Sequence, residues 1–256
     1  MPSIKSQSVL IIGGSSGIGF AVAQGALSQG AIVAIASSNP QRISTAVSKL
    51  TSSNPSLSSA ISGHVCDLSV ADVESNLLTL LNAVTQDGTR LLDHVVNTAI
   101  DPFGGPSSLA QVGRDELLAK TQFSLVVPML IAKLAPSFMK GGFTSSLILT
   151  SGQIGLKPIK GWVVEVPGAA ALFGMVKGLA LELAPRRVNL VSPGATITEL
   201  WGPLEAREER AEMLKGRMLL GRVGQPDEVA EAYIYLMRNW NSTGTVVCSD
   251  GGSILM

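Results

Sequence analysis

Short apolar runs alternate with stretches of helical spacing along almost the whole chain, and this alternation most restricts its possible folds. The run at 8–12 is followed by a helical pattern at 18–29, and the same order repeats to residue 248. Such an order is typical of βαβ units, in which helices cover both faces of a parallel sheet. We therefore predict an α/β fold: a Rossmann-type, doubly wound parallel sheet in three layers, forming a single domain over residues 1–256.

The same patterns predict the individual elements. Residues 52–59 are rich in Ser and predict a surface loop, and residues 198–220 form the least regular region. We find no internal repeat and no low-complexity linker. Strands are expected at 8–12, 31–36, a run ending at 65–67, 92–96, 146–150, 188–191 and 245–248, and helices at 18–29, 40–51, 70–85, 114–139 with an interruption near Pro128, 168–183 and 226–238.

Composition excludes several classes of partner. The 256 residues are enough to bury a large core without a disulfide or a metal. The 19 basic residues balance 19 acidic ones, which argues against a nucleic-acid partner. We see no signal peptide and no apolar run near the ~20 residues of a membrane span. These features predict a soluble, cytoplasmic protein in which Cys66 and Cys248 are buried, reduced thiols.

A glycine-rich turn lies between the first predicted strand and the first predicted helix. Gly13 permits a tight turn, Gly17 lets the backbone approach a pyrophosphate, and Gly19 lets helix and sheet pack closely. The amides at the helix N-terminus then face the phosphate charge. The turn therefore predicts a dinucleotide site made by Gly13, Ser15, Ser16, Gly17, Ile18 and Gly19.

The end of the second predicted strand discriminates between NAD and NADP. An NAD site requires a carboxylate here to bind the ribose hydroxyl, and this segment has none. Hydroxyl groups near a guanidinium suit a 2′-phosphate. We predict NADP(H), bound by Ser37, Ser38, Asn39 and Arg42; the alternative is a polar loop that caps the next helix.

These motifs resemble the short-chain dehydrogenase/reductase family over essentially the whole chain. The glycine turn resembles its TGxxxGxG motif, with Ile12 replacing the threonine, and 97–100 resembles a degraded NNAG element. Residues 221–230 and 249–252 resemble its C-terminal signatures. The resemblance implies cofactor contacts from Asp67, Leu68, Asn97, Thr98, Ala99, Thr150, Pro193, Gly194, Thr196 and Thr198.

The family's catalytic residues are a tyrosine, a lysine four residues later, a serine ~13 residues before the tyrosine and an asparagine on an earlier helix, which together supply a tuned general acid. Two registers are open. One places Phe173 and Lys177 at the tyrosine and lysine positions, but needs an insertion. The gapless register, which we favour, places Glu165, Ala169 and Gly152 at the tyrosine, lysine and serine positions.

The asparagine position falls on Phe123, beside Gln122. The only tyrosines, Tyr233 and Tyr235, lie far downstream, so neither register supplies a tyrosine acid.

Four side chains are candidates for a role in the reaction. Glu165 is expected to stabilise a cation or act as an acid if burial raises its pKa. Trp162 is expected to stack on a flat or cationic substrate, Gln122 to bind a substrate amide, and Asp101 to line the pocket. For each, a structural or surface role is the alternative. Lys177, His64 and His94 are expected to be structural or exposed.

In lacking the tetrad, the chain resembles a divergent fungal branch of the family, the bifunctional reductase/Diels–Alderases of the malbrancheamide and paraherquamide type. Those enzymes bind NADP(H), reduce an iminium and template a [4+2] cycloaddition. The resemblance implies an NADP(H)-dependent reductase of an alkaloid-like iminium, alone or coupled to cyclisation; a non-redox cyclase or isomerase and a catalytically dead NADP(H)-binding protein are alternatives. It also implies a small-molecule substrate, a lid around 198–220, and a homo-oligomer, tetramer or dimer, through 168–183 and the last strand.

Overall fold

The computed structural model describes residues 2–100 and 108–256, and within them one seven-stranded parallel sheet forms the centre of the molecule. The strand order is β3-β2-β1-β4-β5-β6-β7. The predicted doubly wound α/β fold is confirmed. The strands are β1 (Ser8–Ile12), β2 (Ile32–Ser37), β3 (Ile61–Val65), β4 (His94–Asn97), β5 (Ser146–Thr150), β6 (Arg187–Pro193) and β7 (Val246–Ser249).

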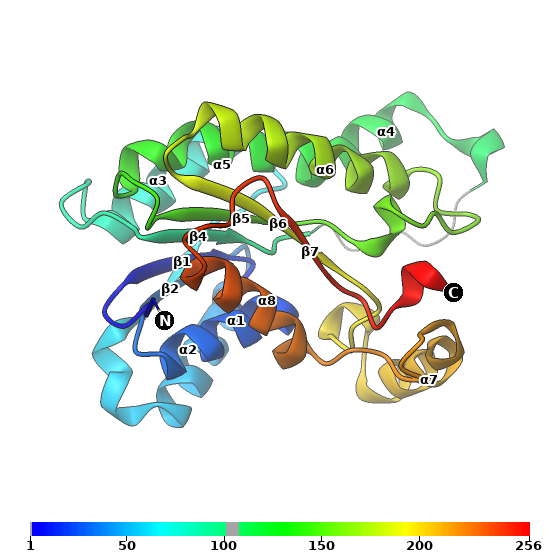
Figure 1. Cartoon of the computed structure of the whole chain (residues 1–256), viewed down its shortest axis with the longest axis horizontal. Coiled ribbons are helices and arrows are strands. Elements are labelled where there is room, and N and C mark those ends of the chain that lie inside the picture. Colours follow the sequence, from blue (N-terminus) through cyan, green and yellow to red (C-terminus); the bar gives the residue numbers. More distant parts are fainter. Residues whose placement is uncertain (1, 101–107) are drawn as a thin grey trace.

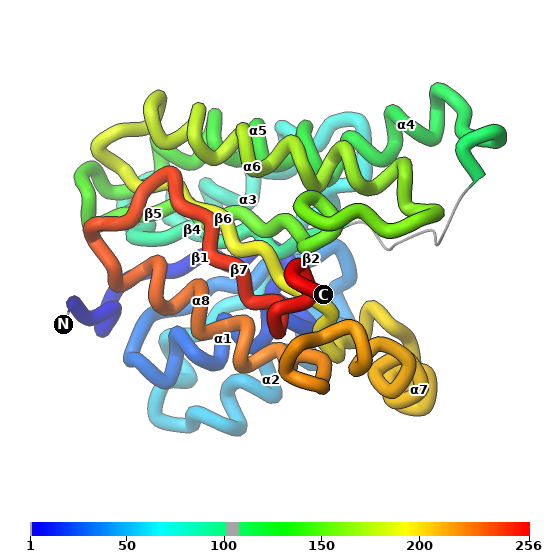
Figure 2. Tube along the Cα trace, turned by 45° about the vertical axis from the view of Figure 1, so that its right-hand side comes forward, coloured from blue at the N-terminus to red at the C-terminus, as the bar shows by residue number. Residues whose placement is uncertain are grey.

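Helices cover both faces of this sheet, and Figure 1 shows the resulting three layers. On one face lie α3 (Val73–Thr85), α4 (Arg114–Thr121), α5 (Val127–Leu134) and α6 (Glu165–Glu182); on the other lie α1 (Gly17–Ser28), α2 (Pro40–Ser53) and α8 (Pro226–Arg238). The remaining helix, α7 (Leu204–Leu214), stands beside the C-terminal residues in both Figure 1 and Figure 2.

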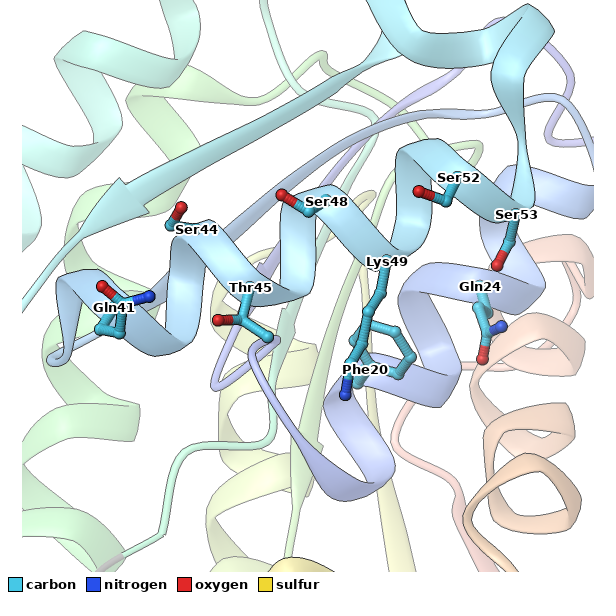
Figure 3. A pocket seen from close by; sticks show the side chains of 9 residues that line it. All are labelled: Phe20, Gln24, Gln41, Ser44, Thr45, Ser48, Lys49, Ser52 and Ser53. Carbon is cyan, nitrogen blue, oxygen red and sulfur yellow. The ribbon is translucent and has the colours of Figure 1, made fainter.

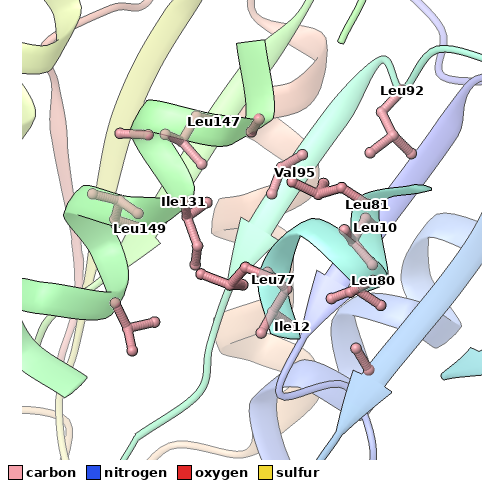
Figure 4. Close-up of a cluster of buried hydrophobic side chains, with 14 of the residues drawn as sticks. Leu10, Ile12, Leu77, Leu80, Leu81, Leu92, Val95, Ile131, Leu147 and Leu149 are labelled. Atoms are coloured by element: carbon pink, nitrogen blue, oxygen red, sulfur yellow. The ribbon is translucent and has the colours of Figure 1, made fainter. Parts of the chain in front are cut away.

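Each face of the sheet buries its own apolar core. Alternate residues of a strand point to opposite faces, so Leu10 and Ile12 pack under α3 and α5, whereas Val9 and Ile11 pack under α1 and α8. Figure 4 shows the first core, where Leu77 and Ile131 meet the strand residues. Burial on both faces explains why the strands read as continuous apolar runs.

The helical region before β5 is interrupted close to the predicted position. A π-helix spans Gln122–Val126 between α4 and α5, and Pro128 lies in the first turn of α5. By length and composition alone, 114–138 would be long and apolar enough to cross a membrane, but this is weak evidence. A core helix passes the same test, and α5 buries Val127 and Ile131.

Two local predictions need correction. Cys248 is exposed, because β7 is the edge strand of the sheet; Cys66 is buried as expected, and burial raises its pKa to about 11. The expected loop at 52–59 is largely helical: α2 continues to Ser53, and a 3₁₀ helix follows at Pro55–Ala60. That short helix buries none of its residues, which is why its sequence has the composition of a loop.

Candidate active site

A cavity of ≈ 740 Å³ opens at the carboxyl ends of the central strands. Ligands of doubly wound sheets bind at this edge, where the strand order reverses, here between β1 and β4. The chain segments that follow β4, β5 and β6 line the cavity, together with the start of α6 and the segment around α7. Eight of the predicted cofactor residues are among the lining: Ile18, Thr98, Ala99, Thr150, Pro193, Gly194, Thr196 and Thr198.

In the glycine turn beside this cavity, Gly13 and Gly19 are enclosed by atoms of the backbone and of Thr98. A Cβ on Gly13, whose φ is +88°, would lie 2.6 Å from the Ala99 nitrogen. A Cβ on Gly19 would lie 2.3 Å from the Gly13 carbonyl oxygen and 2.4 Å from Thr98 Oγ1. Thr98 in turn donates to the Ile12 carbonyl oxygen, through its hydroxyl at 3.0 Å. These contacts bring the start of α1 close to the ends of β1 and β4, as a dinucleotide turn requires.

The remaining predicted cofactor residues lie along the same edge but outside the lining of the cavity. Ser37 ends β2 and pairs with Val65 of β3, and Asn97 ends β4 beside Ile12. Asn39 Oδ1 accepts from the Arg42 backbone N–H at 2.9 Å, so the polar loop does cap α2. Ser69 donates to Asp67 through its hydroxyl and its backbone N–H, which lowers the pKa of Asp67. The others outside the lining are Gly13, Ser15, Ser16, Gly17, Gly19, Ser38 and Leu68.

Glu165 is the first residue of α6 and lines the cavity. Its Oε2 is buried and has no hydrogen-bond partner among the described residues. The positive end of the helix dipole stabilises a carboxylate at this position. A buried oxygen without a donor is nevertheless costly, and a donor or a cation on a bound ligand would remove that cost. Trp162, at the preceding turn, lines the same cavity.

Gln122, another predicted reaction residue, does not line this cavity. The Gln122 amide donates to the Leu68 carbonyl oxygen at 2.9 Å and to that of Val70 at 3.4 Å, so it holds the loop after β3 rather than a substrate. Gln122 begins the π-helix, and Phe123 and Ser124 line the cavity in its place. Asp101 lies outside the described residues.

A second, shallower cavity of ≈ 590 Å³ lies between α1 and α2 (Figure 3). No strand end contributes to it, and most of its lining is hydroxyl and amide side chains on α2. Within residues 2–100 and 108–256, no group of three or more His, Cys, Asp or Glu side chains is placed to hold a metal ion. The large cavity is therefore the candidate active site.

Comparison with known proteins identifies the family. Residues 3–256 match the family described as "SDR-like rossmann domain". The chain belongs to the short-chain dehydrogenase/reductase family. It is 45% identical to "Short-chain dehydrogenase/reductase ATR9" of Stachybotrys chlorohalonatus, over 100% of both chains. Members of this family are oxidoreductases, and membership supports an enzymatic role for this protein.

Two solved structures of the family are informative. The MalC reductase/Diels-Alderase of Malbranchea aurantiaca has 36% identity and a TM-score of 0.91, and the match covers 99% of this chain and 97% of that chain. A small-chain dehydrogenase in complex with NADPH has 25% identity and a TM-score of 0.77, and the match covers 98% of this chain and 100% of that chain.

The two registers assign the family's catalytic tetrad to residues that lie in different places. In the gapless register these positions hold Gly152, Glu165, Ala169 and Phe123, and all four line the candidate active site. Phe173 and Lys177, the pair of the other register, do not line it, and Lys177 is exposed. Neither Tyr233 nor Tyr235 lines it either.

Sequence reasoning missed three features of this site. Thr150 Oγ1 lies 2.6 Å from the Asn97 carbonyl oxygen and 2.7 Å from the Tyr233 hydroxyl. The single Thr150 proton goes to the carbonyl, so buried Tyr233 donates to Thr150 and ties α8 to the cavity wall. The guanidinium carbon Cζ of Arg210 lies 5.2 Å from the centre of the Trp201 ring. The Lys157 ammonium group donates to the Ser253 carbonyl oxygen at 3.0 Å. The contacts of Thr150 and Lys157 join residues at least 53 positions apart, so no local pattern marks them.

Proposed function

We propose that this short-chain dehydrogenase/reductase binds NADP(H). The close contacts of Gly13 and Gly19 provide the cradle that the dinucleotide backbone requires. No carboxylate stands at the end of β2 to repel a 2′-phosphate, and Ser37, Ser38 and Arg42 offer hydroxyl, amide and guanidinium donors there. The NADPH-bound relative, at 25% identity, supports the same cofactor. When bound, NADPH supplies a hydride.

We further propose that the substrate is an iminium. A ketone needs a proton at its oxygen as well as a hydride, whereas an iminium carbon already carries positive charge and needs no acid. The observation that carries this proposal is the buried Oε2 of Glu165, which no described residue satisfies, in a carboxylate that the gapless register assigns to the tyrosine position. Glu165 would pair with the cation, and the face of Trp162 would stack on it.

Coupling of this reduction to a cyclisation rests on the relationship to MalC. That protein is a reductase/Diels-Alderase and shares 36% of its sequence with this chain. By this analogy the protein is an enzyme of natural-product, alkaloid-like biosynthesis that carries out a [4+2] cycloaddition on the reduced product. A cavity of ≈ 740 Å³ is large enough to hold a drug-sized molecule.

An anaerobic single-turnover experiment with NADPH and a cyclic iminium tests the proposal. We expect NADPH absorbance at 340 nm to decay while the amine forms in equal amount. Product formed without NADPH oxidation would instead support a non-redox cyclase or isomerase. If NADPH binds and no iminium or ketone turns over, the protein is a cofactor-binding protein without redox activity.

We also propose that the protein acts in the cytoplasm as a homo-oligomer, a dimer or tetramer, formed through α6 and β7. In the single chain, both elements have solvent-exposed side chains: Leu181 of α6 is 82% exposed, and Cys248 of β7 is exposed. A partner subunit packed against α6 would remove the Leu181 side chain from water.

A further inference from the structure

The N-terminus of α1 already holds a carboxylate. The backbone N–H of Gly17, the first residue of α1, donates to Glu199 Oε2 at 2.9 Å. Ser16, the N-cap residue of the same helix, makes no side-chain capping bond. Glu199 therefore supplies the anionic cap that the helix sequence itself lacks, and the helix dipole reinforces it.

The same amide belongs to the turn on which the cofactor's pyrophosphate is expected. The chain approaches closely here: a Cβ on Gly17 would lie 3.2 Å from Thr198 Cβ and 3.7 Å from Glu199 Oε2. A pyrophosphate on this turn would bring its negative charge against the Glu199 carboxylate. Two anions at one helix terminus repel each other, so they compete for the position.

Glu199 also begins the segment that overhangs the cavity. This lid segment, residues 199–217, comprises a 3₁₀ helix (Glu199–Trp201), α7 and a second 3₁₀ helix (Lys215–Arg217), and none of the three buries a residue. Apart from bonds to its neighbours in sequence, the Gly17–Glu199 hydrogen bond is the only one that joins the lid segment to the rest of the described chain. Occupancy of the turn and attachment of the lid are thus linked through one side chain.

We propose that Glu199 is an affinity-determining residue of the cofactor site, a built-in anion that the cofactor's pyrophosphate must displace. The proposal rests on the proposed dinucleotide site. It means that Glu199 weakens cofactor binding and that binding frees the lid segment from α1. The lid residues Leu200, Trp201 and Arg210 line the cavity, so their release changes access for the substrate.

Titration of NADP⁺ against the full chain, followed by isothermal calorimetry, tests the first consequence. We expect Glu199→Gln to bind NADP⁺ roughly tenfold more tightly, because a like charge next to the phosphate has been removed. Glu199→Asp keeps the negative charge, but its shorter side chain does not reach the Gly17 N–H. This variant therefore distinguishes the effect of the charge from the effect of the hydrogen bond. Glu205→Gln is the matched control: it removes the same charge from an exposed position of the lid segment and should leave the affinity unchanged.

Limited trypsin digestion tests the second consequence with inorganic pyrophosphate as the only ligand. The lid segment offers Arg207, Arg210, Lys215 and Arg217 as cleavage sites. We expect pyrophosphate to accelerate cleavage in the unsubstituted protein. Glu199→Ala, which removes the acceptor oxygen as well as the charge, should be cleaved at the faster rate with or without it. Unchanged thermal melting temperatures would show that the variants remain folded.

The outcomes separate this inference from the proposed function. If Glu199→Gln binds NADP⁺ equally or more weakly, or if pyrophosphate protects the lid segment, Glu199 is a cofactor ligand or a structural cap and the inference is overturned while the cofactor site stands. If neither the unsubstituted protein nor any variant binds NADP⁺ or pyrophosphate, the proposed cofactor site itself is wrong.

Discussion

At the scale of single residues, Glu165 and Gly19 contrast: Glu165 has a polar atom that still needs a partner, whereas Gly19 has no room for any side chain. Glu165 offers a carboxylate oxygen that nothing in the described chain satisfies, in a cavity bounded by Trp162, Phe123 and Ala169. Such a group is stable only if a ligand or water completes it, which is why it points to binding. Gly19, in contrast, is surrounded so closely that any side chain displaces backbone. Under the proposed function, Glu165 contacts the substrate and Gly19 shapes the turn that holds the cofactor.

Replacement of Glu165 by Gln should reduce kcat/KM for an iminium by about 100-fold, since removal of one preorganised group facing a developing or resident charge commonly costs that much. Steady-state kinetics with NADPH in excess would measure it. Glu231→Gln, at an exposed position of α8, is the control and should retain full activity. The dissociation constant of NADP⁺ should not change in either variant. An unaltered rate in Glu165→Gln would remove Glu165 from the reaction.

Substitution of Gly19 by Ala should weaken NADP(H) binding more than tenfold, because the new Cβ would lie 2.3 Å from the Gly13 carbonyl oxygen and force the turn apart. Quenching or enhancement of NADPH fluorescence on titration would measure the loss. Gly25 is also on α1, but a Cβ there meets only Ile234 side-chain atoms at 3.4 Å or more. Gly25→Ala should bind NADPH normally; equal affinities for the two variants would contradict the assignment of the turn.

At the scale of elements, β4 joins the two halves of the sheet through a buried polar contact. His94 on β4 lies 2.8 Å from Ser146 Oγ on β5 and 2.8 Å from Gln7 Oε1 beside β1. Burial, reinforced by the positive charges of Arg187 and Lys140, lowers the pKa of His94 to about 3. The folded protein thus keeps this imidazole neutral, whereas the unfolded chain takes up a proton near pH 6.5.

This difference gives stability a defined pH dependence. A folded-state pKa below the unfolded value contributes stability that is complete above about pH 6.5 and is lost as the pH falls toward 3. Between pH 7.5 and pH 5 the free energy of unfolding should fall by about 2 kcal/mol from this group alone. Urea unfolding at both pH values would measure it. His94→Gln should lose that part of the dependence, and His64→Gln should keep it; equal slopes in the two variants would refute the assignment.

At the scale of the whole molecule, the sequence predicts the fold better than it predicts the site. The order of strands and helices follows from local periodicity, and Pro226 with the capping box of Gln225 and Glu228 marks the start of α8 directly. The cofactor edge is also predictable, because parallel strands end together. The Gly17–Glu199 contact is not, since it joins residues 182 positions apart. Nor is the orientation of Gln122, because the π-helix turns its side chain toward the loop after β3.

Assembly is the remaining property of the whole molecule, and the proposed subunit interface includes α6. Leu181 is 82% exposed on the outer face of α6, where a partner subunit would bury it and gain about 2 kcal/mol per side chain. Leu181→Glu should therefore shift the oligomer to a smaller species, measured by size-exclusion chromatography with light scattering. Leu109 is 72% exposed but lies outside α6 and β7, so Leu109→Glu should leave the oligomer intact. A chain that is monomeric before any substitution, or an oligomer insensitive to Leu181→Glu, would place subunit contacts elsewhere or exclude them.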